Sequence, residues 1–214
     1  MQDFVTWPVR KLYDVKYYIN NRWVSKTHAL TSNLKVGKWH EFDTRILHCL
    51  FDELVNFVEI EQASHHIAWD AETRKKHQAP WYASGWFKWR TWRCADAGIE
   101  HLVWASSLTS NDWIDEGHAD WDKPSQQAIA AQETLALYYW WTQTYPARVD
   151  AMAASGWTEH CNANSKKDGQ YHFGSSCAKS QALLKKTHEI EAAYEAEDEE
   201  MLIRLIKLRK SLWT

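Results

Sequence analysis

Glycine, proline and cysteine are scarce in this chain, which has only seven, four and four of them among 214 residues. So few glycines and prolines argue against a many-turned β-sandwich and favour long helices joined by a few loops. The usual phosphate-binding loops are missing as well, because the sequence contains neither GxGxxG nor GxxxxGKS/T. Any phosphate site must therefore be built from side chains rather than from a glycine-rich backbone.

The cysteines lie far apart, at positions 49, 94, 161 and 177, and none forms a CxxC pair. Nothing in this spacing demands a disulfide framework. The first residues lack the apolar stretch of a secretory signal, and no apolar run approaches the length of a membrane span. A net charge of −3 gives no general attraction to duplex nucleic acid. These absences predict a protein of the reducing cytosol that has no membrane partner.

Apolar residues recur at intervals of three and four positions in several segments, which is typical of amphipathic helices. The pattern predicts helices over residues 44–69, from about 96 to 108, from 124 to about 145 and over 179–212. Residues 1–40 leave helix and hairpin equally open, and residues 146–178 are predicted to be a loop-rich insertion. The whole chain is therefore predicted to be one all-α domain over residues 1–214, a helical bundle with a long C-terminal helix and extended loops.

Tryptophan is abundant, with fifteen residues, and five of them lie between Trp81 and Trp104 among arginines and a lysine. Indole rings can stack on a flat ligand while neighbouring guanidinium groups bind its phosphates. This pattern predicts a small phosphorylated ligand, a nucleotide, sequestered without catalysis. The predicted ligand-binding residues are Trp86, Trp89, Arg90, Trp92 and Arg93. The alternative is that these rings fill a core or an interface and the cations lie at its rim.

Acidic residues interrupt the apolar stripes of three predicted helices, where bundles often hold divalent metals. They support an alternative function, a metal-dependent nucleotide pyrophosphatase or hydrolase that uses Mg²⁺ or Mn²⁺. Its catalytic residues would be Glu53, Glu61, His65, Glu133, Glu197 and Asp198. Its metal ligands would be Glu61, His65, Glu133 and Glu197. The competing interpretation is that these side chains reach water at the ends of the stripes or pair with arginine and lysine.

Two further hypotheses remain open from the residues alone. Two histidines and two cysteines in one loop have the inventory of a zinc site, but an ordinary polar loop is favoured because the first two are adjacent and neighbours rarely both reach one ion: His160, Cys161, His172 and Cys177. Cys94 follows an arginine, but no partner histidine is identifiable, so a structural role is predicted for it. Exposed aromatics and the long last helix also fit a structural or interaction protein that forms a homo-oligomer.

Several blocks of the sequence look like an uncharacterised protein family encoded by tailed bacteriophages. They are EFDTRILH (41–48), LVNFVE (54–59), YYWW (138–141), PAR (146–148) and EEMLIRLI (199–206). The resemblance covers most of the chain in scattered blocks and implies no particular activity. It implies expression in the cytoplasm of an infected host bacterium, where small phage proteins often act on nucleotides or on defences that signal through them.

Overall fold

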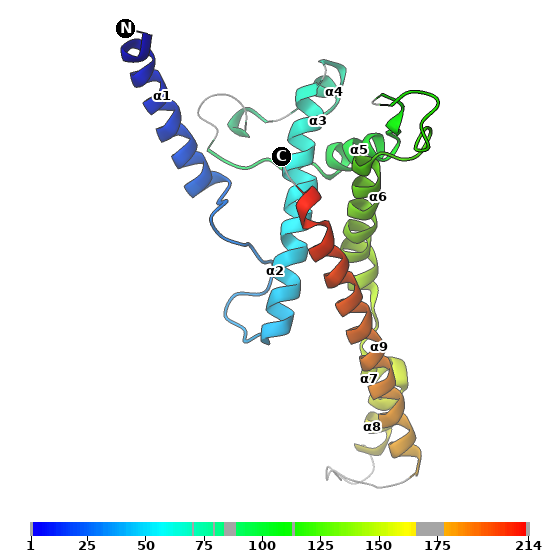
Figure 1. Ribbon diagram of the computed structural model, residues 1–214. Helices are drawn as coiled ribbons and strands as arrows, with labels where there is room; N and C mark the ends of the chain where they lie inside the picture. The colour runs from blue at the N-terminus through cyan, green and yellow to red at the C-terminus, as the bar shows by residue number, and fades with distance from the viewer. Residues whose placement is uncertain are drawn as a thin grey trace. The chain divides into compact units, whose positions relative to one another are not determined.

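The described part of the chain is all-α, as the sequence predicts (Figure 1). The computed structural model describes residues 2–69, 71–78, 80–83, 89–112, 114–165 and 178–212. Within these ranges the β-type pairing consists of an isolated bridge between Thr109 and Pro124. No described helix combines the length and the apolar character needed to cross a membrane.

The chain divides into two compact units, which are described separately below. The N-terminal unit comprises residues 1–138 and 210–214, and the C-terminal unit comprises residues 139–209. The prediction of a single domain over the whole chain stays a prediction.

The aromatic part of the N-terminal segment, for which the sequence left helix and hairpin open, is helical, whereas residues 25–41 contain no helix. α1 (Gln2–Ile19) continues into a π-helical turn, η1 (Asn20–Val24). Much of the apolar surface of this segment stays exposed, at Leu12, Tyr13, Tyr17, Tyr18 and Trp23. Its aromatic residues therefore contribute little to a core within the described chain.

The long helix of the N-terminal unit, residues 42–69, runs without a break through three consecutive elements (Figure 1). They are α2 (Phe42–Asn56), the π-helical η2 (Phe57–Gln62) and α3 (Ala63–Trp69). Together they confirm the helix predicted over residues 44–69. The apolar stripe that predicted this helix supplies core residues, among them Phe51, Leu54 and Val58. The sequence analysis did not identify the π-helical turn, which lengthens the step between the buried residues Val58 and Ala63 to five positions.

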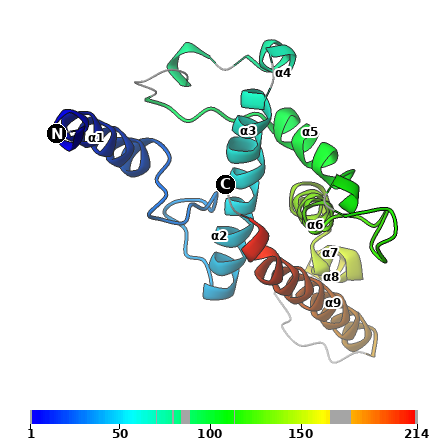
Figure 2. The ribbon, with the colours of Figure 1, turned by 45° about the horizontal axis from the view of Figure 1, so that its top comes forward.

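A short helix, α4 (Ala71–Lys76), follows α3, and α5 (Ala95–Ser106) packs against η2 and α3 and crosses them at an angle (Figure 2). α5 approaches the long helix closely because Gly98 has no side chain. A Cβ built on Gly98 would lie 2.0 Å from the carbonyl oxygen of Val58. This contact fixes which side chains of α5 face those of α3.

The helix predicted from residue 124 to about 145 is confirmed as α6 (Gln126–Tyr139), continued by η5 (Trp140–Thr144) and η6 (Tyr145–Ala147). Within the N-terminal unit, α6 buries Ala128, Ala131 and Leu137. The apolar run at its end contributes Trp140 and Trp141 to the C-terminal unit, where both are buried.

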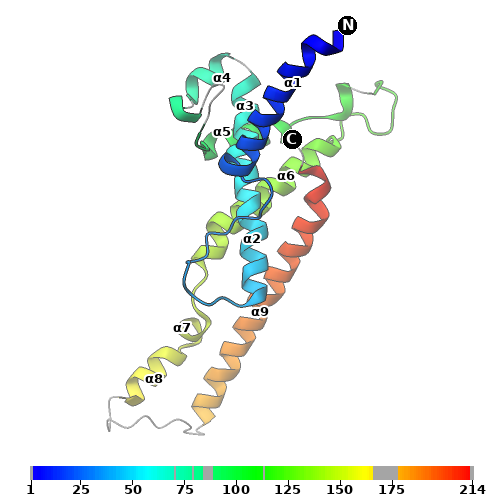
Figure 3. The ribbon, with the colours of Figure 1, turned by 90° about the vertical axis from the view of Figure 1, so that its left-hand side faces the viewer.

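The C-terminal unit pairs two short helices with the long last helix, as Figures 1 and 3 show. α7 (Ala151–Ser155) and α8 (Trp157–Ser165) pack against α9 (Ala178–Leu208), which confirms the long C-terminal helix. The two short helices lie where the sequence predicted loops. They form because the Asp150 side chain accepts a hydrogen bond from the Ala153 N–H, and Gly156 adopts a left-handed φ of 85° between them.

Candidate functional site

The segment that carries the predicted ligand-binding residues is anchored at both ends. His77 follows α4, and its Nδ1 atom lies 3.7 Å from the thiol of Cys94, which directly precedes α5. The Cys94 N–H donates a hydrogen bond of 2.8 Å to the carbonyl of Glu59 in η2. The Thr91 hydroxyl donates to the Val24 carbonyl at 2.9 Å. These contacts hold the chain that precedes α5 beside η2 of the long helix and beside η1.

Two of the five predicted ligand-binding residues, Arg93 and Trp92, make contacts within the protein. Arg93 donates from Nη1 to a carboxylate oxygen of Glu59 at 2.7 Å and from Nη2 to the side chain of Asn56. The Trp92 ring is half-buried against a core cluster of three residues, Ala63, Ile67 and Ala97. Their roles match the alternative that the sequence left open, in which rings fill a core and cations lie at its rim.

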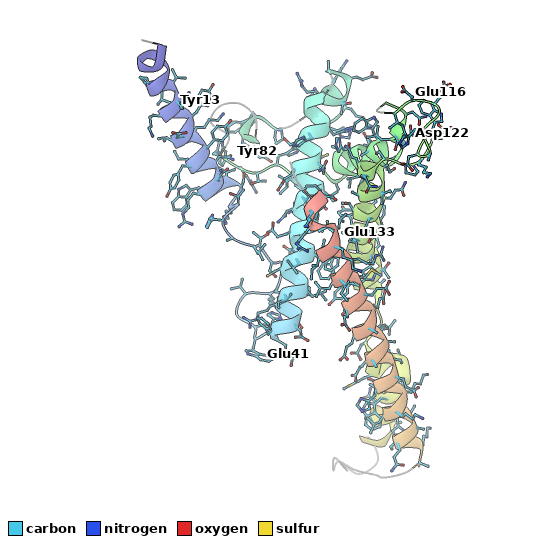
Figure 4. All side chains as sticks on the ribbon, viewed as in Figure 1. Tyr13, Glu41, Tyr82, Glu116, Asp122 and Glu133 are labelled. Carbon is cyan, nitrogen blue, oxygen red and sulfur yellow. The ribbon has the colours of Figure 1, made fainter. Side chains whose placement is uncertain are left out.

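Trp89 and Arg90 remain at the surface and join two aromatic residues that the prediction did not include. Trp81, Tyr82 and Trp89 form an aromatic cluster, with ring centroids 6.1 Å (Trp81–Tyr82), 5.8 Å (Trp81–Trp89) and 5.8 Å (Tyr82–Trp89) apart. Trp81 is 79% exposed and Trp89 is 60% exposed. The guanidinium carbon of Arg90 lies 5.6 Å from the Tyr82 ring centroid, and Figure 4 labels Tyr82 in the segment between α4 and α5.

The aromatic cluster is held together by the backbone as well as by the rings. The Trp89 N–H donates to the Tyr82 carbonyl at 3.3 Å, which holds these two residues beside each other. The fifth predicted residue, Trp86, lies outside the described residues. Pro80 and Gly85 signal a turn in the sequence, but turn signals do not specify which rings meet across it.

The residues of the predicted carboxylate site are not gathered into one cluster among the described residues of the N-terminal unit. Glu53 accepts hydrogen bonds from the Thr31 N–H (2.6 Å) and hydroxyl (2.7 Å). This carboxylate therefore binds the loop that precedes α2. Glu61 and His65 are exposed on the long helix, and Glu133 lies half-buried on α6 (Figure 4). Within the ranges the structure describes, none of these belongs to a group of three potential ligands at metal-binding distance.

Glu197 and Asp198 pair with an arginine, as the competing interpretation of these carboxylates predicts. In the C-terminal unit, Arg148 contacts Glu197 at 2.9 Å and Asp198 at 2.6 Å. The Trp140 indole N–H donates to the other oxygen of Glu197 at 2.7 Å. This hydrogen bond, followed by the hydrogen bond and charge of Arg148, lowers the pKa of Glu197 against the opposing effect of burial. Glu197 and Asp198 therefore form a structural ion-pair contact with Arg148.

A histidine cluster, consisting of His66, His77 and Glu100, brings together groups that sequence reasoning did not select. Oε2 of Glu100 lies 3.0 Å from His77 Nε2 and 3.5 Å from His66 Nε2. Lys76 contacts the other oxygen, Oε1, at 2.5 Å. Hydrogen bonds from Lys76 and then from His77 lower the pKa of Glu100 to about 2, although burial acts in the opposite direction. His66 lies on α3, His77 directly follows α4, and Glu100 lies on α5. Because three segments supply the cluster, no local sequence motif signals it.

A pocket of about 400 Å³ lies beside this cluster, lined mainly by α5, α6 and η2. His101 forms part of its wall, and burial, followed by the charges of His66 and His65, lowers the pKa of His101 to about 4. Amide and hydroxyl groups of Gln62, Gln126 and Thr134 complete the polar lining. Because none of the described residues that line it is an arginine or a lysine, this pocket suits an uncharged polar ligand better than a phosphate.

The remaining cysteine hypotheses have mixed outcomes. His160 contacts the Ser180 hydroxyl at 3.0 Å and Cys161 is exposed, while His172 and Cys177 lie outside the described residues. The zinc site therefore stays a prediction. Cys94 is half-buried and packs against the core, as expected for a structural residue, but it does have a histidine neighbour, His77.

Neither the protein-family models, nor the curated proteins, nor the solved structures that were compared match this chain. The resemblance to a phage-encoded family accordingly stays a prediction. Function must be argued from the contacts of the site itself.

Proposed function

We propose that the protein binds a nucleotide on the aromatic cluster, with Arg90 as the partner of the phosphate groups. The observation that supports this proposal most strongly is the exposure of Trp81 and Trp89, two large rings that stay in water although they are fixed against Tyr82. Indole surface in water is unfavourable, and a flat ligand that covers it removes that surface from solvent. Stacking of a base on an aromatic side chain contributes about 1–3 kcal/mol.

Arg90 supplies the charge that distinguishes a nucleotide from a neutral heterocycle. Its guanidinium lies over the Tyr82 ring, and within the described ranges no carboxylate forms an ion pair with it. A guanidinium can donate two parallel hydrogen bonds to one phosphate group, which an ammonium cannot do. Arg93 is a poorer candidate because Glu59 and Asn56 already accept its hydrogen bonds.

Binding without hydrolysis is the form of this function that the contacts favour. Three of the carboxylates that a metal-dependent hydrolase would need, Glu53, Glu197 and Asp198, are engaged by Thr31 and Arg148. A sequestering protein needs no catalytic group, only an affinity high enough to lower the concentration of free ligand. The aromatic cluster and the Arg90 guanidinium are therefore sufficient for the proposed binding.

Isothermal calorimetry with mono-, di- and cyclic nucleotides, with and without EDTA, tests the proposal. Calorimetry is preferable to fluorescence because fifteen tryptophans contribute to the emission. We expect one nucleotide class to bind with a Kd that EDTA leaves unchanged. Trp89→Leu and Arg90→Gln should each raise that Kd about tenfold, since each removes about 1.4 kcal/mol or more of stacking or phosphate contact. Arg90→Lys should recover only part of the loss.

The chain offers a matched control in Arg22 and Trp23, another exposed cation–ring pair, whose guanidinium carbon lies 5.2 Å from the indole centroid. Arg22→Gln and Trp23→Leu should leave the Kd within about twofold. A panel in which no nucleotide binds would contradict the proposal. Release of phosphate or pyrophosphate that needs Mg²⁺ or Mn²⁺ would instead favour the hydrolase alternative.

Host cytoplasm and a homo-oligomeric state remain proposals of the same kind. The exposed apolar side chains of α1, including Leu12, Tyr17 and Tyr18, are the feature that favours self-association. Light scattering across a range of protein concentrations should give a mass above that of one chain, and Leu12→Glu should lower it. A monomer mass at every concentration would contradict this part of the proposal.

A further inference from the structure

We propose that the histidine cluster, His66, His77 and Glu100, is a binding site for one divalent transition-metal ion, with zinc as the reference case. Each residue offers one ligand atom, and these three atoms all lie within 4.8 Å of one another. No other group of three such ligand atoms occurs in the part of the chain that the structure describes. This inference is independent of nucleotide binding, because it uses none of the residues of the aromatic cluster.

The spacing of the donor atoms fits an ion between them. Zinc–nitrogen and zinc–oxygen bonds of about 2.0–2.2 Å place neighbouring ligands of a tetrahedron about 3.4 Å apart. Glu100 Oε2 lies 3.0 Å from His77 Nε2 and 3.5 Å from His66 Nε2. The two imidazole nitrogens lie within 4.8 Å of each other, so side-chain rotations that bring them closer would complete the geometry around an ion.

The three ligands are held by rigid parts of the fold. His66 lies on α3 and Glu100 on α5, and the close contact of Gly98 with Val58 fixes these helices together. The His77 N–H donates to the Thr73 carbonyl at 2.9 Å, which prolongs α4 to the ligand. Ligands that are already positioned lose little conformational entropy when the metal binds.

Contacts around the ligands orient them for coordination. The Cys94 thiol lies 3.7 Å from Nδ1 of His77, so a proton on Nδ1 leaves the lone pair on Nε2 for the metal. Lys76 contacts Oε1 of Glu100 and thereby directs Oε2 toward both imidazoles. The side chain of His77 is only 8% exposed, which shields one side of the site from water.

The donor set selects the class of metal. Two imidazoles and one carboxylate favour Zn²⁺, Co²⁺, Ni²⁺ or Fe²⁺ over Mg²⁺ and Ca²⁺, which prefer oxygen ligands. Three protein ligands also leave a coordination position for water or a small ligand. The competing explanation of the same distances is a network without metal, in which protonated histidines and Lys76 pair with Glu100.

Binding of Zn²⁺ and Co²⁺ to the full chain, produced without a histidine tag and stripped with a chelator, separates these explanations. We expect one equivalent to bind, and the visible absorption of bound Co²⁺ to indicate four- or five-coordination. His66→Gln and Glu100→Gln should each weaken binding at least about 100-fold, because loss of a direct ligand exceeds the 10–100-fold effect typical of outer contacts. Far-ultraviolet circular dichroism checks that both variants are folded.

Surface histidines provide the control, since the chain has eleven histidines that could bind metal weakly. His188 pairs with Glu191 at 3.3 Å on the exposed face of α9, so His188→Gln should bind metal like the unchanged protein. Arg90→Gln should do so as well, which separates failure of this site from failure of nucleotide binding. Binding that is absent in the unchanged protein, or equal in the folded variants, would overturn the proposal in favour of the metal-free network.

Discussion

Gly98→Ala should lower the free energy of unfolding by about 3 kcal/mol, the upper end of the usual cost of overpacking. The added methyl carbon would meet the Val58 carbonyl oxygen at 2.0 Å and its carbonyl carbon at 2.8 Å. Both are backbone atoms of η2, so no rotamer change relieves the clash and α5 must move away from the long helix. The displacement would separate Glu100 and His101 from α3.

The expected loss of stability is opposite in sign to the usual effect of replacing a helical glycine by alanine. Replacing an exposed glycine within a helix by alanine usually stabilises a protein by about 0.5–1 kcal/mol, because alanine has the higher helix propensity. Gly117→Ala, in an exposed turn, is the control for steric clash, since no atom lies within 4 Å of the Cβ that it would add. Urea unfolding followed by circular dichroism should show a loss of stability for position 98 and a change within about 0.5 kcal/mol for position 117. Stabilisation by Gly98→Ala would show that α5 does not approach Val58 closely.

Arg148→Met should destabilise the C-terminal unit by about 3 kcal/mol, as expected when one partner of a largely buried ion pair is removed. The Arg148 side chain is 13% exposed, and its guanidinium carbon lies 5.4 Å from the ring centroid of Trp140 and 4.9 Å from those of Tyr145 and Tyr194. The hydrogen bond and charge of Asp198, joined by those of Glu197, raise the pKa of Arg148 against the opposing effect of burial. Without this cation two neighbouring carboxylates lose their common partner.

Hydrogen exchange of α9 amides measures this loss within the unit concerned. Lys185→Met is the control on the same helix, because the Lys185–Glu189 pair is exposed and 3.9 Å long, and such pairs contribute about 0–1 kcal/mol. Arg148→Lys should restore only part of the protection, since an ammonium cannot donate to both carboxylates in the same geometry. Equal exchange in the Met variants of Arg148 and Lys185 would contradict a structural role for Arg148.

The contact between Arg148 and Glu197 should stabilise the protein less in acid. The pKa of Glu197 is lowered in the folded state from its ordinary value of 4.5. The stabilisation linked to this carboxylate is therefore fully present above about pH 4.5 and is lost as the pH falls through the lower folded value. The difference between Arg148→Met and the unchanged protein should accordingly shrink below pH 4.5.

Much of the helical architecture could be predicted from periodicity alone. The spacing of Leu54, Val58 and their neighbours predicted the long helix, and the apolar stripe up to Leu208 predicted α9. A local pattern suffices here because a helix satisfies its backbone hydrogen bonds within one segment. The short helices α7 and α8 were missed because each is only one to three turns long and gives little periodic signal.

The candidate sites depended on contacts between segments far apart in the sequence. Composition predicted an aromatic surface with arginines, and Trp89 and Arg90 lie on such a surface. Trp92 packs on the core and Arg93 pairs with Glu59. Trp81 and Tyr82, which the prediction did not include, lie against Trp89. These residues resemble one another in sequence, and only their neighbours in the fold separate an exposed ring from a buried one.

Helical structure, the long last helix and the lack of a glycine-rich phosphate loop all follow from the amino-acid order, because helix formation and loop motifs are local properties. The meeting of His66, His77 and Glu100 follows from packing, since three different segments supply them and the close contact at Gly98 fixes two of these. A ligand site depends on the distance between side chains, and for residues of different helices that distance is set by packing.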